Sequence, residues 1–514
     1  MNIDYNKASS RYLGVAKSLV GESINAEQVF AKSVVLMGER DALKTQNGLW
    51  CFMDSLRLLV RVVGKLTICI PPGFAELETE ARKCCSDTYL RGQPQFVISD
   101  SASPFQHADA ILNIGIHVNS SLPWTTISSN GWVARISSGS KQLPSDMGQP
   151  NPIAALFAAS LGVTEVFKRI YGVPASVAPL LEKAELSLFE NSTEFDSLGP
   201  VLPNIITAPD TLLVGAGAIG NGIALLMAQL PVAGRLHIVD KQDYQDENHG
   251  TSVLLEKAGW IGNSKAEQLA QWLTQNSALQ ATGDKALINE ALGSELIKSM
   301  AIDLVLNGLD DVQARHDSQL AWPSIIVDGG INETGAAVIQ HRLDDHGLAC
   351  LICSFKLQKQ DIRETQRQLT GLHSSALSDQ GRLLTVQDII EADPGKQEWL
   401  REMLKSKRTI CSVVSEAGLR RLGVNAEDGF RPSAPFVATA AAAMVIAEAL
   451  KALLYPEKRY SQRFTIGNLF LGPQSLANSS RYAEPWCSCV KHRSLIDSLL
   501  KRRKQNQNLQ SNPH

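Results

Sequence analysis

The distribution of apolar and polar positions predicts alternating strands and helices in the second half of the chain. Apolar runs at 211–214 and 235–239 enclose a glycine turn and a helical pattern, which is the order of a βαβ unit. Further strand-like runs follow at 303–306 and 324–327, and an Ala-rich helical stretch begins at Pro435. This order predicts an α/β fold built on a parallel sheet.

The first half repeats the same rhythm more weakly. A strand-like run at 65–70 precedes DAILNIG at 109–115, which matches DLVLNGL at 303–309, and an Ala-rich helix is predicted at 151–168. The ends of the two Ala-rich stretches match as well, EVFKRIYG in one and EALKALLYP in the other. The pattern predicts two tandem Rossmann-like folds, although two unrelated α/β domains would show a similar rhythm.

In the first copy, residues 49–51 (Leu-Trp-Cys) stand near the position where glycines are needed, so we expect this copy to be degenerate. The predicted domains are an inactive adenylation-like domain and an active ATP-binding domain, followed by a cysteine-bearing insert and a disordered basic tail. Their boundaries are 1–200 for the first, 201–355 with 430–490 for the second, 356–429 for the insert and 491–514 for the tail.

Composition narrows the class of protein. With 49 Lys and Arg against 52 Asp and Glu among 514 residues, the charge gives no reason to expect nucleic acid or a membrane surface as a partner. The most apolar stretch, 435–455, contains Glu448 and Lys451, so it predicts a buried helix. The start of the chain contains Asp4 and no signal-like segment, and we expect a cytoplasmic protein.

The string VGAGAIGNG places Gly215, Gly217 and Gly220 directly after a predicted strand and at the start of a helix. Such glycines let the backbone approach a phosphate, and the helix N-terminus offers free N–H groups. Asp240 ends the next predicted strand, where a carboxylate can hold ribose hydroxyls. These features fit an NAD-dependent dehydrogenase as well as an ATP enzyme.

Two further segments carry a resemblance to a known family. VDKQDYQDENHGT, followed by GNSKA, resembles the pattern of the ThiF/MoeB and ubiquitin-activating enzymes, with Asp240, Asn248 and Lys265 at its marked positions. DLVLNGLDDVQAR resembles the same family's DxVxxxxDNxxxR segment. The resemblance places Asp310 on the aspartate that binds Mg²⁺ and Arg315 on the arginine that follows it.

Two positions near these motifs depart from the family pattern, and a third residue, at the start of the chain, resembles it. Asp311 stands where the family pattern has asparagine, and Thr251 stands where it has arginine. The second departure implies that another cation substitutes or that activity is reduced. Arg11 resembles the family's N-terminal arginine that reaches ATP, although it would also fit an ordinary surface arginine.

Four cysteines form two close pairs, Cys350 with Cys353 and Cys487 with Cys489. A CxxC turn lets two thiolates hold one tetrahedral zinc ion, and the second pair would complete a structural Zn²⁺ site. Because the second pair is CxC, His492 is an alternative ligand.

A fifth cysteine, Cys411, stands alone in RTICSVVSEAG after a polar insert. It resembles the catalytic cysteine of activating enzymes, whose thiolate displaces AMP from an adenylate to form a thioester. Lys405, Lys407 and Arg408 would lower its pKa. An inert, partly buried thiol is the alternative.

The resemblance implies an enzyme that uses ATP and Mg²⁺ to adenylate the C-terminus of a ubiquitin-like protein and then transfers it to a conjugating-enzyme-like partner. The whole-chain plan resembles the activating enzymes of bacterial ubiquitin-like conjugation operons of the antiphage type, and a homodimer stays open. Three alternatives remain: a sulfur-carrier adenylyltransferase of the MoeB/ThiF type, an NAD-dependent oxidoreductase and an inactive scaffold.

Overall fold

The computed structural model describes residues 3–21, 24–344, 346–355, 366–367, 369–379, 382–410, 412–414, 432–456 and 464–510. The chain divides into two compact units. Unit 1 combines Met1–Phe355 with Pro432–His514 and contains both β-sheets, whereas unit 2 is Lys356–Arg431.

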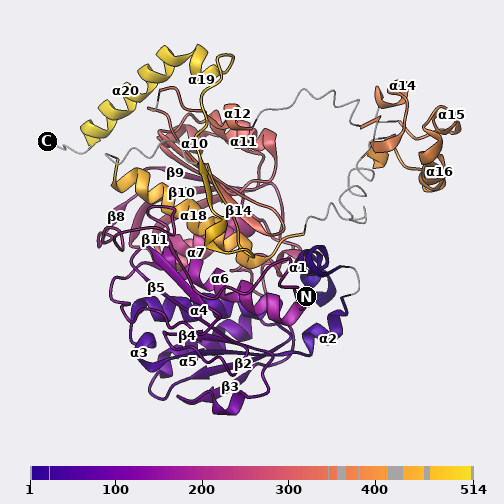
Figure 1. The fold of residues 1–514 in the computed structure, drawn as a ribbon. Coiled ribbons are helices and arrows are strands. Elements are labelled where there is room, and N and C mark those ends of the chain that lie inside the picture. The colour runs from indigo at the N-terminus through magenta and orange to yellow at the C-terminus, as the bar shows by residue number, and fades with distance from the viewer. Residues whose placement is uncertain are drawn as a thin grey trace. The chain divides into compact units, whose positions relative to one another are not determined.

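The first sheet has seven strands in the order β3-β2-β1-β4-β5-β6-β7 (Figure 1). The first five strands in this order, β3-β2-β1-β4-β5, pair in parallel. The pairings of β5 with β6 and of β6 with β7 are antiparallel. The strands are β1 Ser33–Gly38, β2 Lys65–Ile70, β3 Gln95–Ile98, β4 Ala110–Ile114, β5 Trp124–Asn130, β6 Val133–Ser137 and β7 Ala184–Ser187.

The second sheet has nine strands, with the order β11-β10-β9-β12-β13-β14-β15-β16 and β8 paired to β10. Its pairings are parallel from β11 to β13 and antiparallel from β13 to β16. The strands are β8 Ile206–Thr207, β9 Thr211–Val214, β10 Val232–Val239, β11 Ala278–Asp284, β12 Leu304–Asn307, β13 Ile325–Ile331, β14 Gly335–Arg342, β15 Phe464–Asn468 and β16 Ala477–Ser479.

The longer helices of unit 1 connect and cover these sheets. They are α1 Tyr5–Val20, α4 Gln46–Val62, α5 Ala75–Thr88, α6 Pro152–Tyr171, α7 Ala218–Gln229, α8 Lys265–Asn276, α11 Val312–Gln319, α18 Pro435–Leu454 and α20 Arg493–Gln510. Shorter helices are α2 Ala26–Phe30, α3 Arg40–Leu43, α9 Ile288–Ala291, α10 Glu295–Ser299, α12 Leu351–Ser354 and α19 Ser488–Lys491.

The two sheets follow the same strand order over seven positions, with β1 matching β9 and β7 matching β15. The helices α6 and α18 also match in a buried ion pair near their C-terminal ends. Glu165 pairs with Lys168, and Glu448 pairs with Lys451 at 2.5 Å. The α/β fold with parallel sheets is therefore confirmed, and the repeated order supports an internal duplication.

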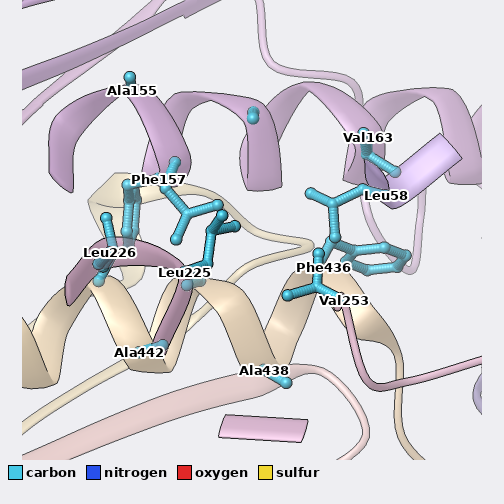
Figure 2. Packing of buried hydrophobic residues seen from close by; sticks show 14 of the residues in the cluster. Leu58, Ala155, Phe157, Val163, Leu225, Leu226, Val253, Phe436, Ala438 and Ala442 are labelled. Atoms are coloured by element: carbon cyan, nitrogen blue, oxygen red, sulfur yellow. The ribbon is translucent and has the colours of Figure 1, made fainter. Parts of the chain in front are cut away.

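A layer of helices from both halves forms the core of unit 1. In Figure 2, side chains of α6 (Phe157), α7 (Leu225) and α18 (Phe436) lie in the space between the helices. Gly222 allows α7 to approach α18 closely, because a Cβ there would lie 2.6 Å from the Cβ of Ala442. The two halves thus share one continuous apolar interior.

The apolar helix α18 is long enough, by length and composition alone, to cross a membrane. However, 89% of its most apolar window is buried inside unit 1. The prediction of a buried core helix is confirmed.

Two expectations about local structure were wrong. Residues 49–51 lie inside α4, and the turn that matches the glycine turn is Gly38-Glu39-Arg40, after β1. The sequence reading missed β1 and began the first half at β2. At the C-terminus, residues expected to be disordered form α20, where Ile496 and Leu500 are buried and pack beside the four cysteines.

Unit 2 contains α14 Ser374–Leu377, α15 Val386–Ile390 and α16 Gln397–Lys405 around its own apolar cluster. Arg382 donates two hydrogen bonds to Asp388, at 2.7 and 2.6 Å, and this contact lowers the pKa of Asp388 to about 2. The predicted catalytic residue Cys411 lies outside the described residues.

Candidate nucleotide and metal sites

The glycine turn joins β9 to α7 at the carboxyl end of the parallel strands. Gly215 has φ +94°, and a Cβ there would lie 2.8 Å from the carbonyl oxygen of Gly308. Gly220 packs against the turn, since its Cβ would lie 2.1 Å from the carbonyl oxygen of Gly215. In contrast, no described atom lies within 4 Å of a Cβ built on Gly217. The open side at Gly217 is where a phosphate can approach the N-terminus of α7.

Two polar side chains hold this turn. Asp240, directly after β10, accepts hydrogen bonds of 2.8 Å from the backbone N–H groups of Ala216 and Gln242. Asn221, buried in α7, donates to the carbonyl oxygens of Ala216 and Gly217 at 3.0 and 2.9 Å. Asp240 therefore fixes the turn, and a carboxylate at this position after the strand can accept hydrogen bonds from ribose hydroxyls.

Lys265, the first residue of α8, is almost completely buried beside this turn. Its Nζ donates to Oε1 of Gln242 at 2.8 Å. Burial lowers the pKa of Lys265, and the nearby carboxylates of Asp240, Glu247 and Asp310 oppose that shift. The structure thus brings together Lys265, Asp240 and Asp310, which the sequence had placed in one site.

Arg11 reaches the same place from α1. It also acts electrostatically on Lys265, and its Nη2 lies 3.8 Å from Oε1 of Glu247. The helix α1 can approach because a Cβ on Gly250 would lie 2.0 Å from the carbonyl oxygen of Ala8. Two cationic side chains, Arg11 from the first half and Lys265 from the second, therefore lie in one region beside Glu247.

The loop after β12 carries two aspartates with different roles. Asp310 is exposed, whereas Asp311 caps α11 by accepting a hydrogen bond of 2.7 Å from the N–H of Ala314. Arg315 donates to both carboxylate oxygens of Asp328 at 3.0 Å and to the carbonyl oxygen of Leu309. Arg315 is thus committed to a buried ion pair that braces this loop.

The remaining motif residues lie in the loop after β10, which includes the short helix η2 Asp246–Asn248. Asn248 is buried and accepts a hydrogen bond of 2.9 Å from the N–H of Gln245. Thr251 is also buried, and its hydroxyl donates to the carbonyl oxygen of Asn248 at 3.3 Å. Both side chains therefore shape the loop.

The first half has a different arrangement at the matching position. The carboxylate of Glu39, after β1, accepts hydrogen bonds from the N–H groups of Ile116 and His117 at 3.1 and 2.8 Å. A Cβ on Gly115 would lie 2.2 Å from Cδ of this glutamate. A carboxylate fills this position and would repel a phosphate.

The sulfur atoms of Cys350, Cys353, Cys487 and Cys489 lie within 4.8 Å of one another. Three of the sulfur pairs lie 3.8, 3.5 and 3.6 Å apart, close to the edge of about 3.8 Å expected for a tetrahedral zinc–thiolate site. The backbone N–H of Glu484 donates to Sγ of Cys353 at 3.3 Å, and a hydrogen bond of this kind favours the charged thiolate. The donor set fits a structural zinc ion, and His492 is exposed and outside this group.

Comparison with known proteins identifies the family. The ThiF family model matches residues 193–487, which is more than half of the chain. The chain belongs to the ThiF family. This match covers the glycine turn, the loop with Lys265, Asp310 and all but one of the clustered cysteines.

The other comparisons are more distant. The chain is 33% identical over 238 residues to the uncharacterized protein y4jF of Sinorhizobium fredii (strain NBRC 101917 / NGR234). That match covers 45% of this chain and 43% of the relative, so this ThiF-family chain spans less than half of that protein's length. Structures of E. coli MccB with ATP and with SeMet MccA are similar at 15% and 12% identity, with TM-scores of 0.34 and 0.36. These matches cover 55% and 65% of this chain and 67% and 74% of the MccB chains.

Sequence reasoning missed several residues of the nucleotide site. Asn221 could have been found, because a buried amide in the otherwise apolar helix AIGNGIALLM requires hydrogen-bond partners. Gln242 and Glu247 gave no signal of their own, since polar residues are ordinary in a loop. Their roles depend on contacts with Lys265 and Arg11 that only the fold establishes.

Proposed function

We propose that this protein uses ATP to adenylate the C-terminal carboxylate of a ubiquitin-like protein. Membership of the ThiF family supports an adenylating activity. The observation that carries the proposal is the charge arrangement around Lys265, which lies beside the glycine turn and within electrostatic reach of Arg11, Asp240 and Asp310. An NAD-dependent oxidoreductase would use the turn and Asp240 but would leave Lys265 without a role.

In the proposed reaction, a carboxylate oxygen attacks the α-phosphate of ATP and pyrophosphate leaves. The N–H groups at the start of α7 would bind phosphate oxygens beside Gly217. Lys265 and Arg11 would stabilise the charge that develops during transfer. Asp310 is an exposed carboxylate at the end of a parallel strand and fits Mg²⁺, which would neutralise charge on the leaving pyrophosphate.

The position filled by Glu39 supports one nucleotide site per chain. Because the carboxylate of Glu39 already accepts the N–H groups of Ile116 and His117, the first half offers no free phosphate-binding turn there. The first half would instead contribute Arg11 to the site in the second half.

We extend the proposal to a second step, in which the thiolate of Cys411 attacks the adenylate, forms a thioester and releases AMP. The ubiquitin-like protein would then pass to a conjugating-enzyme-like partner. The support for this step is the resemblance of the sequence around Cys411 to the catalytic segment of activating enzymes, since Cys411 itself lies outside the described residues. The four cysteines would hold a structural zinc ion. The proposal includes a cytoplasmic location, and the burial of α18 argues against a membrane span.

Exchange of radiolabelled pyrophosphate into ATP tests the first step. The purified protein is mixed with Mg²⁺·ATP and a small β-grasp protein that ends in an exposed glycine-bearing tail, ideally one encoded by a neighbouring gene. We expect exchange that depends on that tail, and calorimetry should show about one ATP bound per chain. Binding of NADH without binding of ATP would reject the proposal.

A further inference from the structure

The loop 249–255 follows Asn248 in the nucleotide site but carries no cation of its own. Thr251 stands at the position where the family pattern has an arginine, and its side chain is buried against the carbonyl oxygen of Asn248. The loop therefore lacks the cationic side chain of the family pattern. Side chains from other segments must hold its backbone in place and supply positive charge beside the nucleotide.

Arg61, on α4 of the first half, extends into this loop. Its Nη1 donates to the carbonyl oxygen of His249 at 2.7 Å, and its Nη2 donates to those of Val253 and Leu255 at 2.9 and 3.0 Å. Val253 of this loop and Leu58 of α4 belong to the same apolar cluster, part of which Figure 2 shows. One guanidinium thus joins three carbonyl groups over seven residues, which the planar fork of arginine permits.

The charge on Arg61 is retained despite its burial. The residue is 3% exposed, and burial lowers its pKa to about 10, so the guanidinium is still protonated at neutral pH. Burying a charge is costly unless it is hydrogen-bonded. The hydrogen bonds that Arg61 donates to the loop all go to backbone carbonyl oxygens, whereas the buried Arg315 forms an ion pair with the carboxylate of Asp328.

Other first-half groups enclose the same loop. The N–H of Lys257 donates to the carbonyl oxygen of Asp87 at 2.7 Å, and its Nζ donates to that of Tyr89 at 3.3 Å. On the other side, the carbonyl oxygen of Ala8 on α1 lies against Gly250. Several segments of the first half therefore contact this part of the nucleotide site, and Arg61 alone donates three hydrogen bonds to the loop.

We propose that Arg61 is a positioning residue that holds the loop 249–255 in its nucleotide-binding shape, so that the first half sets the affinity of the second half for ATP. This inference rests on the proposed function. It assigns the first half a role in nucleotide binding beyond the contribution of Arg11.

The test uses the full-length variants Arg61→Met and Arg61→Lys, with Arg135→Met as a matched control. Arg135 is also a 3% exposed arginine of the first half, but it pairs with Asp146 and Glu185, away from the loop. Calorimetry measures the Kd for Mg²⁺·ATP, hydrogen exchange reports on the peptide 249–257, and thermal unfolding reports on stability.

We expect both Arg61 variants to weaken ATP binding about tenfold or more, the equivalent of about 1.4 kcal/mol, and to speed hydrogen exchange in the loop. The lysine variant retains the charge but cannot span three carbonyl groups, so it tests the clamp separately from the charge. The Arg135 variant should lower thermal stability and leave the Kd and the loop exchange within about twofold of the unaltered protein.

Each result decides a specific point. Unchanged ATP affinity and loop exchange in Arg61→Met would make Arg61 an ordinary buried arginine and overturn the inference. Full affinity in Arg61→Lys would also overturn it, because charge alone would then suffice. Absence of ATP binding by the unaltered protein would reject the proposed function itself, which is distinguishable from failure at Arg61 alone.

Discussion

Asp54, in α4, accepts a hydrogen bond of 2.9 Å from Nε2 of Gln229, the last residue of α7. A fully buried carboxylate therefore lies at the contact between the two halves of unit 1. Burial raises the pKa of Asp54 to about 6, although Arg57 and Gln229 favour its charged form.

This raised pKa predicts how Asp54 changes stability with pH. Because its folded pKa lies above the unfolded value near 3.8, the folded state binds the proton more tightly, and the free energy of unfolding falls as pH rises from about 4 to about 6. The shift corresponds to about 3 kcal/mol. We expect Asp54→Asn to lose this part of the pH dependence, measured by urea unfolding at pH 4, 5, 6 and 7.5. If the free energy of unfolding changed with pH in the same way in the variant and the unaltered protein, Asp54 would not be the source of this pH dependence.

Asp310 and Asp311 offer a comparison between neighbouring carboxylates. We expect Asp310→Ala to abolish pyrophosphate exchange with little change in thermal stability, because Asp310 is exposed and is the proposed Mg²⁺ ligand. Asp311→Ala should retain exchange and lose about 1 kcal/mol of stability, since it removes the N-cap of α11. Pyrophosphate exchange that survives in Asp310→Ala, or that is lost only in Asp311→Ala, would contradict the assignment of Asp310 as the Mg²⁺ ligand.

The sequence predicted the fold of the second half well because its signals are local. The glycines 215, 217 and 220 need particular backbone space, and the apolar run before them fits a buried strand, so the βαβ unit follows from a short window. The match between EVFKRIYG and EALKALLYP was also informative. Its physical basis is the buried pair of Glu165 with Lys168, repeated by Glu448 with Lys451.

What the sequence did not predict depends on contacts between distant segments. Glu39 follows an ordinary apolar run, and only the approach of Gly115 shows that its carboxylate fills the first-half turn. Arg61 is one of several charged residues on α4, and its contacts lie 188 to 194 positions away along the chain. Arg315 matched the family pattern, but the position of Asp328 decides that it forms a buried ion pair.

The four-cysteine cluster predicts bound zinc. We expect about one zinc ion per chain by elemental analysis, and loss of that zinc in a variant with Cys350→Ser and Cys353→Ser. Because the cluster joins the segment after β14 to the C-terminal segment, this variant should also unfold at lower temperature. Cys84→Ser, in the first half and outside the cluster, should retain the zinc. A folded protein without bound metal would contradict the prediction.

The thioester at Cys411 can be separated from adenylation by chemistry. With ATP and the ubiquitin-like protein, the unaltered enzyme should give a slower band on a non-reducing gel, and thiol reductant should remove it, because a thioester exchanges with free thiols whereas an amide does not. Cys411→Ala should lose this band and keep pyrophosphate exchange, since adenylation precedes attack by the thiol. Ser412→Ala is the neighbouring control and should keep both. Loss of band and exchange together would make Cys411 structural. A band that persists in Cys411→Ala would place the nucleophile elsewhere, and unit 2 would then be better explained as a docking unit for the protein that accepts the adenylate.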